Sequence, residues 1–125
     1  MERCAGRIGK VAGLALLTAA LGMPLRADGF RTVTERGAFL DLVQGRQLTR
    51  LGIRLDVLAS GGIRGKAFGK PVIGVWHWRD GHFCRDLSVG REGLDANCQV
   101  VKVRGDTVRF IADKGAGASA DLELR

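Results

Sequence analysis

The chain has 125 residues and a formal net charge of +7, from 20 basic and 13 acidic side chains. This length allows a single small domain. The basic residues are spread singly along the chain and do not form the cluster that marks a nucleic-acid-binding surface. Those of the central segment are Arg46, Arg50, Arg54, Arg64, Lys66 and Lys70. We therefore expect a solvated basic face and no nucleic-acid partner.

The first 27 residues have the pattern of a secretory signal peptide. Residues 1–10 carry three basic side chains and one acidic one, and residues 11–25 contain no charge. A membrane-spanning helix needs about 20 apolar residues, whereas a signal peptide has an apolar stretch of about 7–15 residues and a small residue at its exit. We expect cleavage after Ala27, export to the periplasm, and no stable membrane anchor afterwards. The alternative is an uncleaved anchor or a buried helix.

Cleavage would leave residues 28–125. A chain of 98 residues has the size of one small domain. The leader holds four of the 20 basic and one of the 13 acidic residues, so 16 and 12 remain and the net charge falls to +4. Cys4 leaves with it. The other two cysteines, Cys84 and Cys98, then form an even pair in an oxidising compartment, where a disulfide is the default. A catalytic thiol at Cys84, beside His77 or His82, is the alternative.

One short helix is predicted near the start of the mature domain. Thr34 can cap residues 35–44, and Phe39, Leu40 and Val43 share one helical face. A glycine, Gly45, follows and is expected to end the helix.

Everything after the helix is expected to form β-strands. Residues 53–57 alternate strictly between apolar and charged side chains, which is the period of a half-buried strand. Asp80 and Gly81 are the strongest hairpin signal, because both central positions of that tight turn need a positive φ. The other predicted strands are residues 47–50, 63–68, 72–78, 82–87, 98–103, 107–112 and 120–125.

Seven or eight strands at intervals of about ten residues are typical of an antiparallel sandwich or barrel. The 19 glycines favour the barrel, because strongly coiled strands need them at close approaches. An up-and-down barrel also leaves no unpaired edge strand. We predict a mainly β domain of this kind, with one short N-terminal helix after the signal peptide.

The turn at Asp80 and Gly81 also sets the register of the hairpin around it. Aromatic side chains and an arginine then share one face, and both histidines share the other face with a cysteine. The candidate ligand-binding residues on the first face are Trp76, Trp78, Phe83 and Arg85. Their structural role would be cross-strand aromatic packing with a guanidinium over an indole. Their functional role would be to line the mouth or floor of a ligand cavity.

Three apparent chemical sites are better explained as structure. His77, His82 and Cys84 share a face, but zinc needs three or four ligands and a disulfide would remove the cysteine. Residues 115–120 match the dinucleotide fingerprint, yet no helix follows them to hold a pyrophosphate. No serine lies in a G-x-S-x-G sequence, and no carboxylate pair stands out. We expect no catalytic residue, no cofactor and no metal.

Motifs along nearly the whole mature chain resemble those of a group of small exported proteins of alphaproteobacteria. They are Gly45-Arg46, residues 52–55, residues 65–69, Gly74-x-Trp76-x-Trp78, residues 81–85, Asn97-Cys98-Gln99, Gly115-Ala116-Gly117 and residues 122–125. Some members of that group carry the name dihydrodipicolinate reductase. An enzyme of that name has a nucleotide-binding α/β domain, a substrate domain and a paired-histidine motif. A mature chain of 98 residues is too short for the two domains, and it contains no adjacent histidines. The resemblance implies export, the Cys84 to Cys98 bridge and a β fold, and assigns no catalytic residue.

Gly74, Trp76 and Arg85 also resemble a feature of calycin-type barrels, which include lipocalins and bacterial periplasmic protease inhibitors. These barrels use a Gly-x-Trp strand and an arginine packed on the tryptophan. In lipocalins that sequence opens the first strand, whereas here it falls in the middle of the chain. The resemblance is therefore one of packing.

The sequence as a whole predicts a non-enzymatic periplasmic barrel that binds a small apolar or anionic ligand, or a periplasmic protein, near Trp76, Trp78, Phe83 and Arg85. One alternative is a partner-binding module similar to a protease inhibitor, which would act through residues 88–96 and the mature N-terminus. The other is an oxidoreductase of the reductase name, which would bind NADPH or NADH.

Overall fold

The structure, a computed structural model, describes residues 28–125, and Arg31–Arg125 form one compact unit. The predicted leader, residues 1–27, lies outside the described residues. The described domain is mainly β with a single short α-helix, as predicted. Within residues 28–125 no helix has the length and hydropathy of a membrane span.

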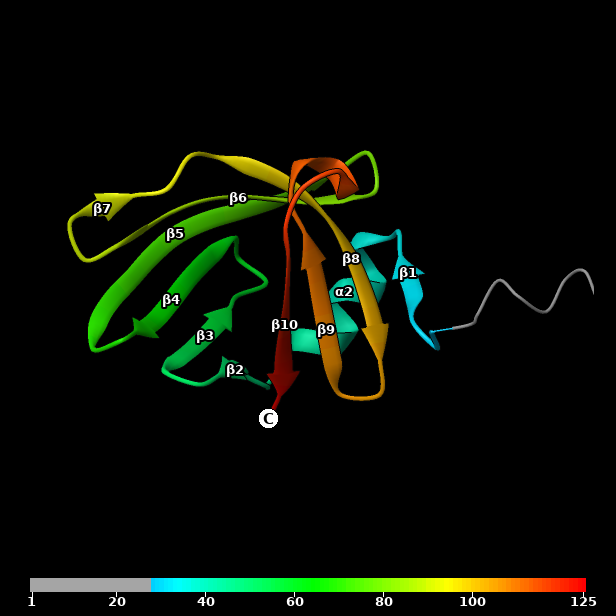
Figure 1. Ribbon diagram of the computed structural model, residues 1–125, viewed down its shortest axis with the longest axis horizontal. Coiled ribbons are helices and arrows are strands. Elements are labelled where there is room, and N and C mark those ends of the chain that lie inside the picture. Colours follow the sequence, from blue (N-terminus) through cyan, green and yellow to red (C-terminus); the bar gives the residue numbers. More distant parts are fainter. Residues whose placement is uncertain (1–27) are drawn as a thin grey trace, which may run out of the picture. The chain divides into compact units, whose positions relative to one another are not determined.

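Eight strands close into an antiparallel up-and-down barrel (Figure 1). Going around it, each strand pairs with the next in the order β2, β3, β4, β5, β6, β8, β9, β10, and β10 returns to β2. The barrel, and not the sandwich, is therefore the fold. The bounds are β2 (Leu48–Arg50), β3 (Ile53–Val57), β4 (Gly62–Ala67), β5 (Lys70–Arg79), β6 (His82–Val89), β8 (Asn97–Arg104), β9 (Thr107–Ile111) and β10 (Ser119–Leu124).

Two short strands that the sequence did not suggest lie outside this cycle. β1 (Arg31–Val33) pairs with β8, and β7 (Glu92–Gly93) pairs with β6. The glycine-rich segment that matches the dinucleotide fingerprint, residues 115–120, begins at the end of a 3-10 turn, η3 (Asp113–Gly115), and runs into β10. Because β9 and β10 are antiparallel neighbours, this segment is a hairpin loop, as predicted.

Helix α2 (Arg36–Val43) closes one end of the barrel. Phe39 and Val43 are buried on its inner face. The predicted cap is wrong: Glu35 occupies the N-cap position without a side-chain hydrogen bond. The carbonyl oxygen of Thr34 instead accepts a hydrogen bond from Trp78 Nε1 at 3.0 Å. A tertiary contact therefore fixes this end of the helix, and a local capping bond does not.

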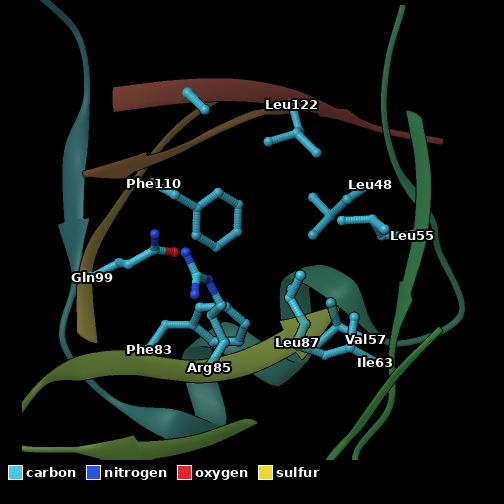
Figure 2. Close-up of a pocket in the computed structure, with 11 residues that line it drawn as sticks. Leu48, Leu55, Val57, Ile63, Phe83, Arg85, Leu87, Gln99, Phe110 and Leu122 are labelled. Carbon is cyan, nitrogen blue, oxygen red and sulfur yellow. The ribbon is translucent and has the colours of Figure 1, made fainter. Parts of the chain in front are cut away.

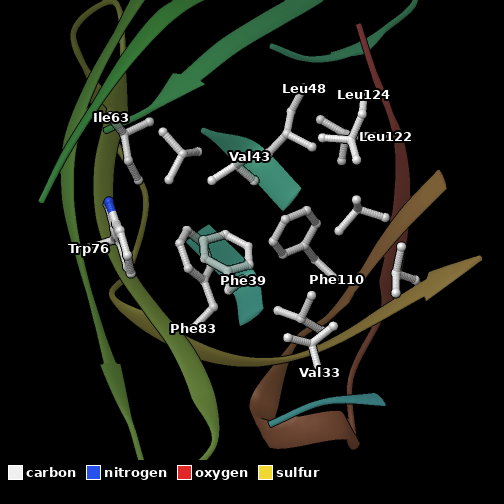
Figure 3. Packing of buried hydrophobic residues seen from close by; sticks show 14 of the residues in the cluster. Val33, Phe39, Val43, Leu48, Ile63, Trp76, Phe83, Phe110, Leu122 and Leu124 are labelled. Atoms are coloured by element: carbon white, nitrogen blue, oxygen red, sulfur yellow. The ribbon is translucent and has the colours of Figure 1, made fainter. Parts of the chain in front are cut away.

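Phe39 stands at the centre of an aromatic cluster in the core (Figure 3). Its side chain has 0% exposure, and its ring lies 5.4, 5.2, 5.1 and 6.4 Å from those of Trp76, Trp78, Phe83 and Phe110. Both tryptophans lie near the end of β5, so α2 fills the barrel end that carries the β5–β6 turn. The β2–β3 and β4–β5 turns consequently lie at the opposite end.

The predicted disulfide joins Cys84 to Cys98. The two cysteines lie directly opposite one another on β6 and β8, and the pairing of these strands completes the barrel cycle. The bond is therefore a cross-strand clamp at the closure of the barrel.

Candidate functional site

The hairpin of β5 and β6 has the predicted register. Trp78 lies opposite Phe83, and Trp76 lies opposite Arg85. Asp80 and Gly81 form the turn with φ values of 50° and 79°, the left-handed geometry that Asp and Gly favour in such turns. The four candidate ligand-binding residues therefore do share the inner side of the hairpin.

The structure divides these four residues into two pairs. Trp76 and Trp78 pack against Phe39 at the closed end, and both indole nitrogens donate hydrogen bonds to main-chain carbonyls. Trp76 is only 4% exposed and donates to the carbonyl of Leu58 at 2.8 Å. Their hydrogen-bonding capacity and ring faces are thus used within the fold. Phe83 and Arg85, by contrast, line a cavity.

The cation over the Trp76 ring is not the predicted one. The guanidinium carbon of Arg36, from α2, lies 5.1 Å from the ring centroid. This contact replaces the predicted pair of Trp76 with Arg85. Strand register correctly places Arg85 opposite Trp76. It gives no information about α2, whose Arg36 lies over the indole ring.

The cavity occupies the barrel interior (Figure 2). It has a volume of about 150 Å³ and is partly open to solvent. Apolar side chains line it from β2, β3, β4, β6, β9 and β10, among them Leu55 from β3 and Leu122 from β10. Only two lining residues are polar, Arg85 from β6 and Gln99 from β8. A cavity of about 150 Å³ lined by such side chains accepts a single aromatic ring or a short alkyl chain.

Arg85 gives this cavity its electrostatic character. Burial of the guanidinium lowers the pKa of Arg85, and the negative charges of Asp86 and Asp95 partly offset the effect. An arginine still keeps its proton at any physiological pH. Its Nη1 atom donates a hydrogen bond to the carbonyl oxygen of Asp95 at 2.6 Å. The result is a fixed, partly desolvated positive charge in the wall of an apolar cavity.

Gln99 is the polar neighbour of this charge, and sequence reasoning missed it. Gln99 lies opposite Phe83 on β8, one position diagonal to Arg85 on the same side of the sheet. Figure 2 shows both polar side chains on one wall of the cavity, extended toward each other. The period-two pattern of β8 was the available signal, but the pairing of β6 with β8 was needed to bring the two together.

The histidine face of the hairpin carries the disulfide. His77 lies opposite Cys84, and Cys84 is bonded to Cys98. The described residues contain no group of three or more histidine, cysteine or acidic side chains arranged to hold a metal ion.

The chain matches no family model, and comparisons with curated proteins and with solved structures likewise found no match.

Proposed function

We propose that this protein is an exported, non-enzymatic binding protein that takes a small ligand with an apolar body and an anionic end into its barrel cavity. The observation that carries the proposal is the position of Arg85, a partly buried cation in an otherwise apolar wall. Apolar lining with one or two placed polar groups is the usual composition of a small-molecule site. The apolar walls would hold the body of the ligand, and Arg85 with Gln99 would bind its anionic end.

The volume of the cavity sets the class of ligand. About 150 Å³ fits one ring or a short chain, so a short-chain or aromatic monocarboxylate is the proposed class. A nicotinamide dinucleotide is far larger than this cavity. That difference supports a binding function over the oxidoreductase alternative.

Export through residues 1–27 is part of the same proposal. The Cys84–Cys98 bond supports it, because stable disulfides are characteristic of oxidising compartments such as the periplasm. The intact mass of protein recovered from a periplasmic fraction should correspond to residues 28–125, two hydrogens below the reduced mass. A mass that retains the leader, or free thiols on both cysteines, would contradict export.

Thermal unfolding with small probes tests the binding function. Hexanoate and benzoate are the anionic probes, hexanol is the matched neutral one, and NADPH tests the oxidoreductase alternative. A ligand present at 100 times its Kd stabilises the native state by about 2.7 kcal/mol, which shifts the Tm of a domain of this size by roughly 10–20 °C. We expect the carboxylates to raise Tm, hexanol to raise it less, and NADPH to leave it unchanged.

Variants of two arginines on the same hairpin identify the cation. Arg85→Gln should abolish the advantage of hexanoate over hexanol, since it removes the charge from the wall. Arg79→Gln, an exposed change on the neighbouring strand, should leave that advantage intact. If neither carboxylate shifts Tm in the unchanged protein, the proposed function is wrong.

A further inference from the structure

Two apolar side chains project from the barrel end opposite α2. Leu51, in the β2–β3 turn, is 95% exposed, and Phe68, in the β4–β5 turn, is 73% exposed. The backbone N–H of Phe68 donates to the carbonyl of Gly52 at 2.7 Å, so the two turns are joined. Together Leu51 and Phe68 form what we term the apolar tip.

The backbone at the tip holds Phe68 in an unfavourable conformation. Its φ of +52° lies in the left-handed region, which a bulky side chain rarely occupies. The ring of Phe68 lies over Gly52, where an added Cβ would come within 2.7 Å of Phe68 Cε1. The fold thus retains a strained, exposed aromatic ring at a place where asparagine or glycine would be easier to accommodate. A function for the exposed ring would explain why the strain is kept.

Positive charge surrounds the apolar tip. The turns and the strand segments nearest to it, residues 48–55 and 62–75, contain five basic residues. The nearest acidic residue on these strands is Asp56, which follows on β3 and lies opposite Arg64. Arg54 and Lys66 lie directly opposite each other on β3 and β4, an arrangement of like charges that destabilises a sheet unless an anion offsets it. In the part of the chain that the structure describes, neither one forms an ion pair with a carboxylate.

A shallow depression beside the tip brings these cations together. It has a volume of about 360 Å³ and is lined by Arg50, Gly52, Ile53, Arg54, Lys66 and Gly69. Three cationic side chains, with no acidic group in the lining, are suited to a phosphate ester. Apolar side chains next to such a phosphate-binding depression match the two layers of a bilayer surface, its anionic head groups and the acyl chains beneath them.

We propose that this end of the barrel docks on membranes that contain anionic phospholipid. Leu51 and Phe68 enter the acyl boundary, while Arg50, Arg54 and Lys66 contact head-group phosphates. Docking is peripheral and reversible, because two apolar side chains bury far less surface than a spanning helix. The proposal does not depend on the ligand in the barrel cavity.

Vesicle co-sedimentation tests the docking surface. The protein is used as recovered from expressing cells, with its N-terminus defined by intact mass, so that any contribution from residues 1–27 is common to all variants. The probes are vesicles of phosphatidylglycerol with phosphatidylethanolamine, and vesicles of phosphatidylcholine alone. We expect binding to the first, little binding to the second, and weaker binding as salt increases.

Paired variants separate the two parts of the surface. Leu51→Ser with Phe68→Asn should weaken vesicle binding about tenfold or more, because it removes both inserting side chains. Asparagine tolerates the left-handed backbone, so this variant should stay folded. The control is Ile73→Ser with Val75→Ser, which removes two other exposed apolar side chains, 61% and 60% exposed, from β5.

The charged part of the surface is tested separately. Arg54→Gln with Lys66→Gln should abolish the preference for phosphatidylglycerol. Arg31→Gln with Arg79→Gln, an equal change in charge, should preserve it.

Three outcomes would overturn the proposal. One is unchanged vesicle binding by the Leu51 and Phe68 variant, and another is equal binding to both kinds of vesicle. The third is a dimer of the unchanged protein that the same variant dissociates, which would assign the apolar tip to a second copy of this chain.

Discussion

Arg109 and Asp121 form a two-pronged ion pair on the outside of the barrel. They lie opposite each other on β9 and β10, and two nitrogens of the guanidinium, Nε and Nη2, donate to the two carboxylate oxygens at 2.7 and 3.0 Å. The hydrogen bond from Arg109 is the main cause that lowers the pKa of Asp121 below its ordinary value of 3.8. Both side chains remain partly exposed, at 30% and 41%, so solvent screens the pair and its stabilisation is modest.

The lowered pKa of Asp121 predicts how the stability of the domain depends on pH. Folding favours the charged form of this carboxyl, so its stabilisation is complete above pH 3.8 and is lost as the pH falls through the folded pKa. Asp121→Asn should therefore reduce the free energy of unfolding at neutral pH by less than about 1 kcal/mol. The deficit relative to the unchanged protein should shrink in acid.

Urea unfolding at pH 7 and at about pH 2.5 measures this difference. Asp41→Asn is the control, because it removes an equal charge from an exposed position on α2. A deficit for Asp121→Asn that is as large in acid as at neutral pH would contradict the assignment.

Two glycines inside strands allow neighbouring strands of the barrel to approach closely. Gly65 on β4 lies opposite Leu55 on β3, and an added Cβ would overlap the carbonyl oxygen of Arg54. Gly74 on β5 lies opposite Leu87 on β6, whose own Cβ would meet a Cβ placed there. Adjacent strands approach this closely where the sheet coils strongly, and only glycine permits it.

Substitution at two glycines should consequently have opposite effects. Gly65→Ala should destabilise the domain by on the order of 1–3 kcal/mol, as overpacking of a tight site does. Gly37→Ala lies within α2 with nothing near its added methyl and should stabilise by roughly 0.4–1 kcal/mol. Urea midpoints of the two variants measure both signs, and equal effects at the two positions would show that close strand approach is not what Gly65 provides.

The sequence was most informative about the elements themselves. Alternating side chains and turn residues predicted all eight barrel strands to within a few residues, because period-two patterning and positive-φ turns are local properties. The cap of α2 was mistaken, since the group that holds Thr34 is an indole 44 positions away. β1 and β7 were missed because strands of three and two residues are too short to show a pattern.

At the scale of the whole molecule, the barrel has two different ends. Helix α2 fills one end, where its Phe39 packs against Trp76 and Trp78 of β5. The other end carries the apolar tip with its positive charges. Alternation along β5 could predict which side chains face inward, but not how deep they lie. The depth of Trp76 is set by α2, which takes the indole into the core and leaves only Phe83 and Arg85 of the four candidates on the cavity. That division could not be predicted without the closed barrel.

The final prediction concerns closure of the barrel. β6 and β8 pair through three residue pairs, against eight between β5 and β6, so the Cys84–Cys98 bond reinforces the shorter seam. The two cysteines are 14 positions apart in the sequence. A disulfide that closes a loop of about 15 residues stabilises the folded state by about 3 kcal/mol in the chain-entropy model. Reduction should lower the free energy of unfolding by about that much, which appears as a lower urea midpoint. The double variant Cys84→Ala with Cys98→Ala should have the same lowered midpoint and should not respond to reductant.

Because Phe83 and Arg85 flank Cys84 on β6, and Gln99 follows Cys98 on β8, the same seam holds one wall of the cavity. Loosening it should weaken binding of a carboxylate probe under conditions where the reduced domain is still folded. The comparison is the Tm shift given by hexanoate before and after reduction. An unchanged shift, together with a lowered midpoint, would mean that the disulfide stabilises the barrel without positioning Arg85.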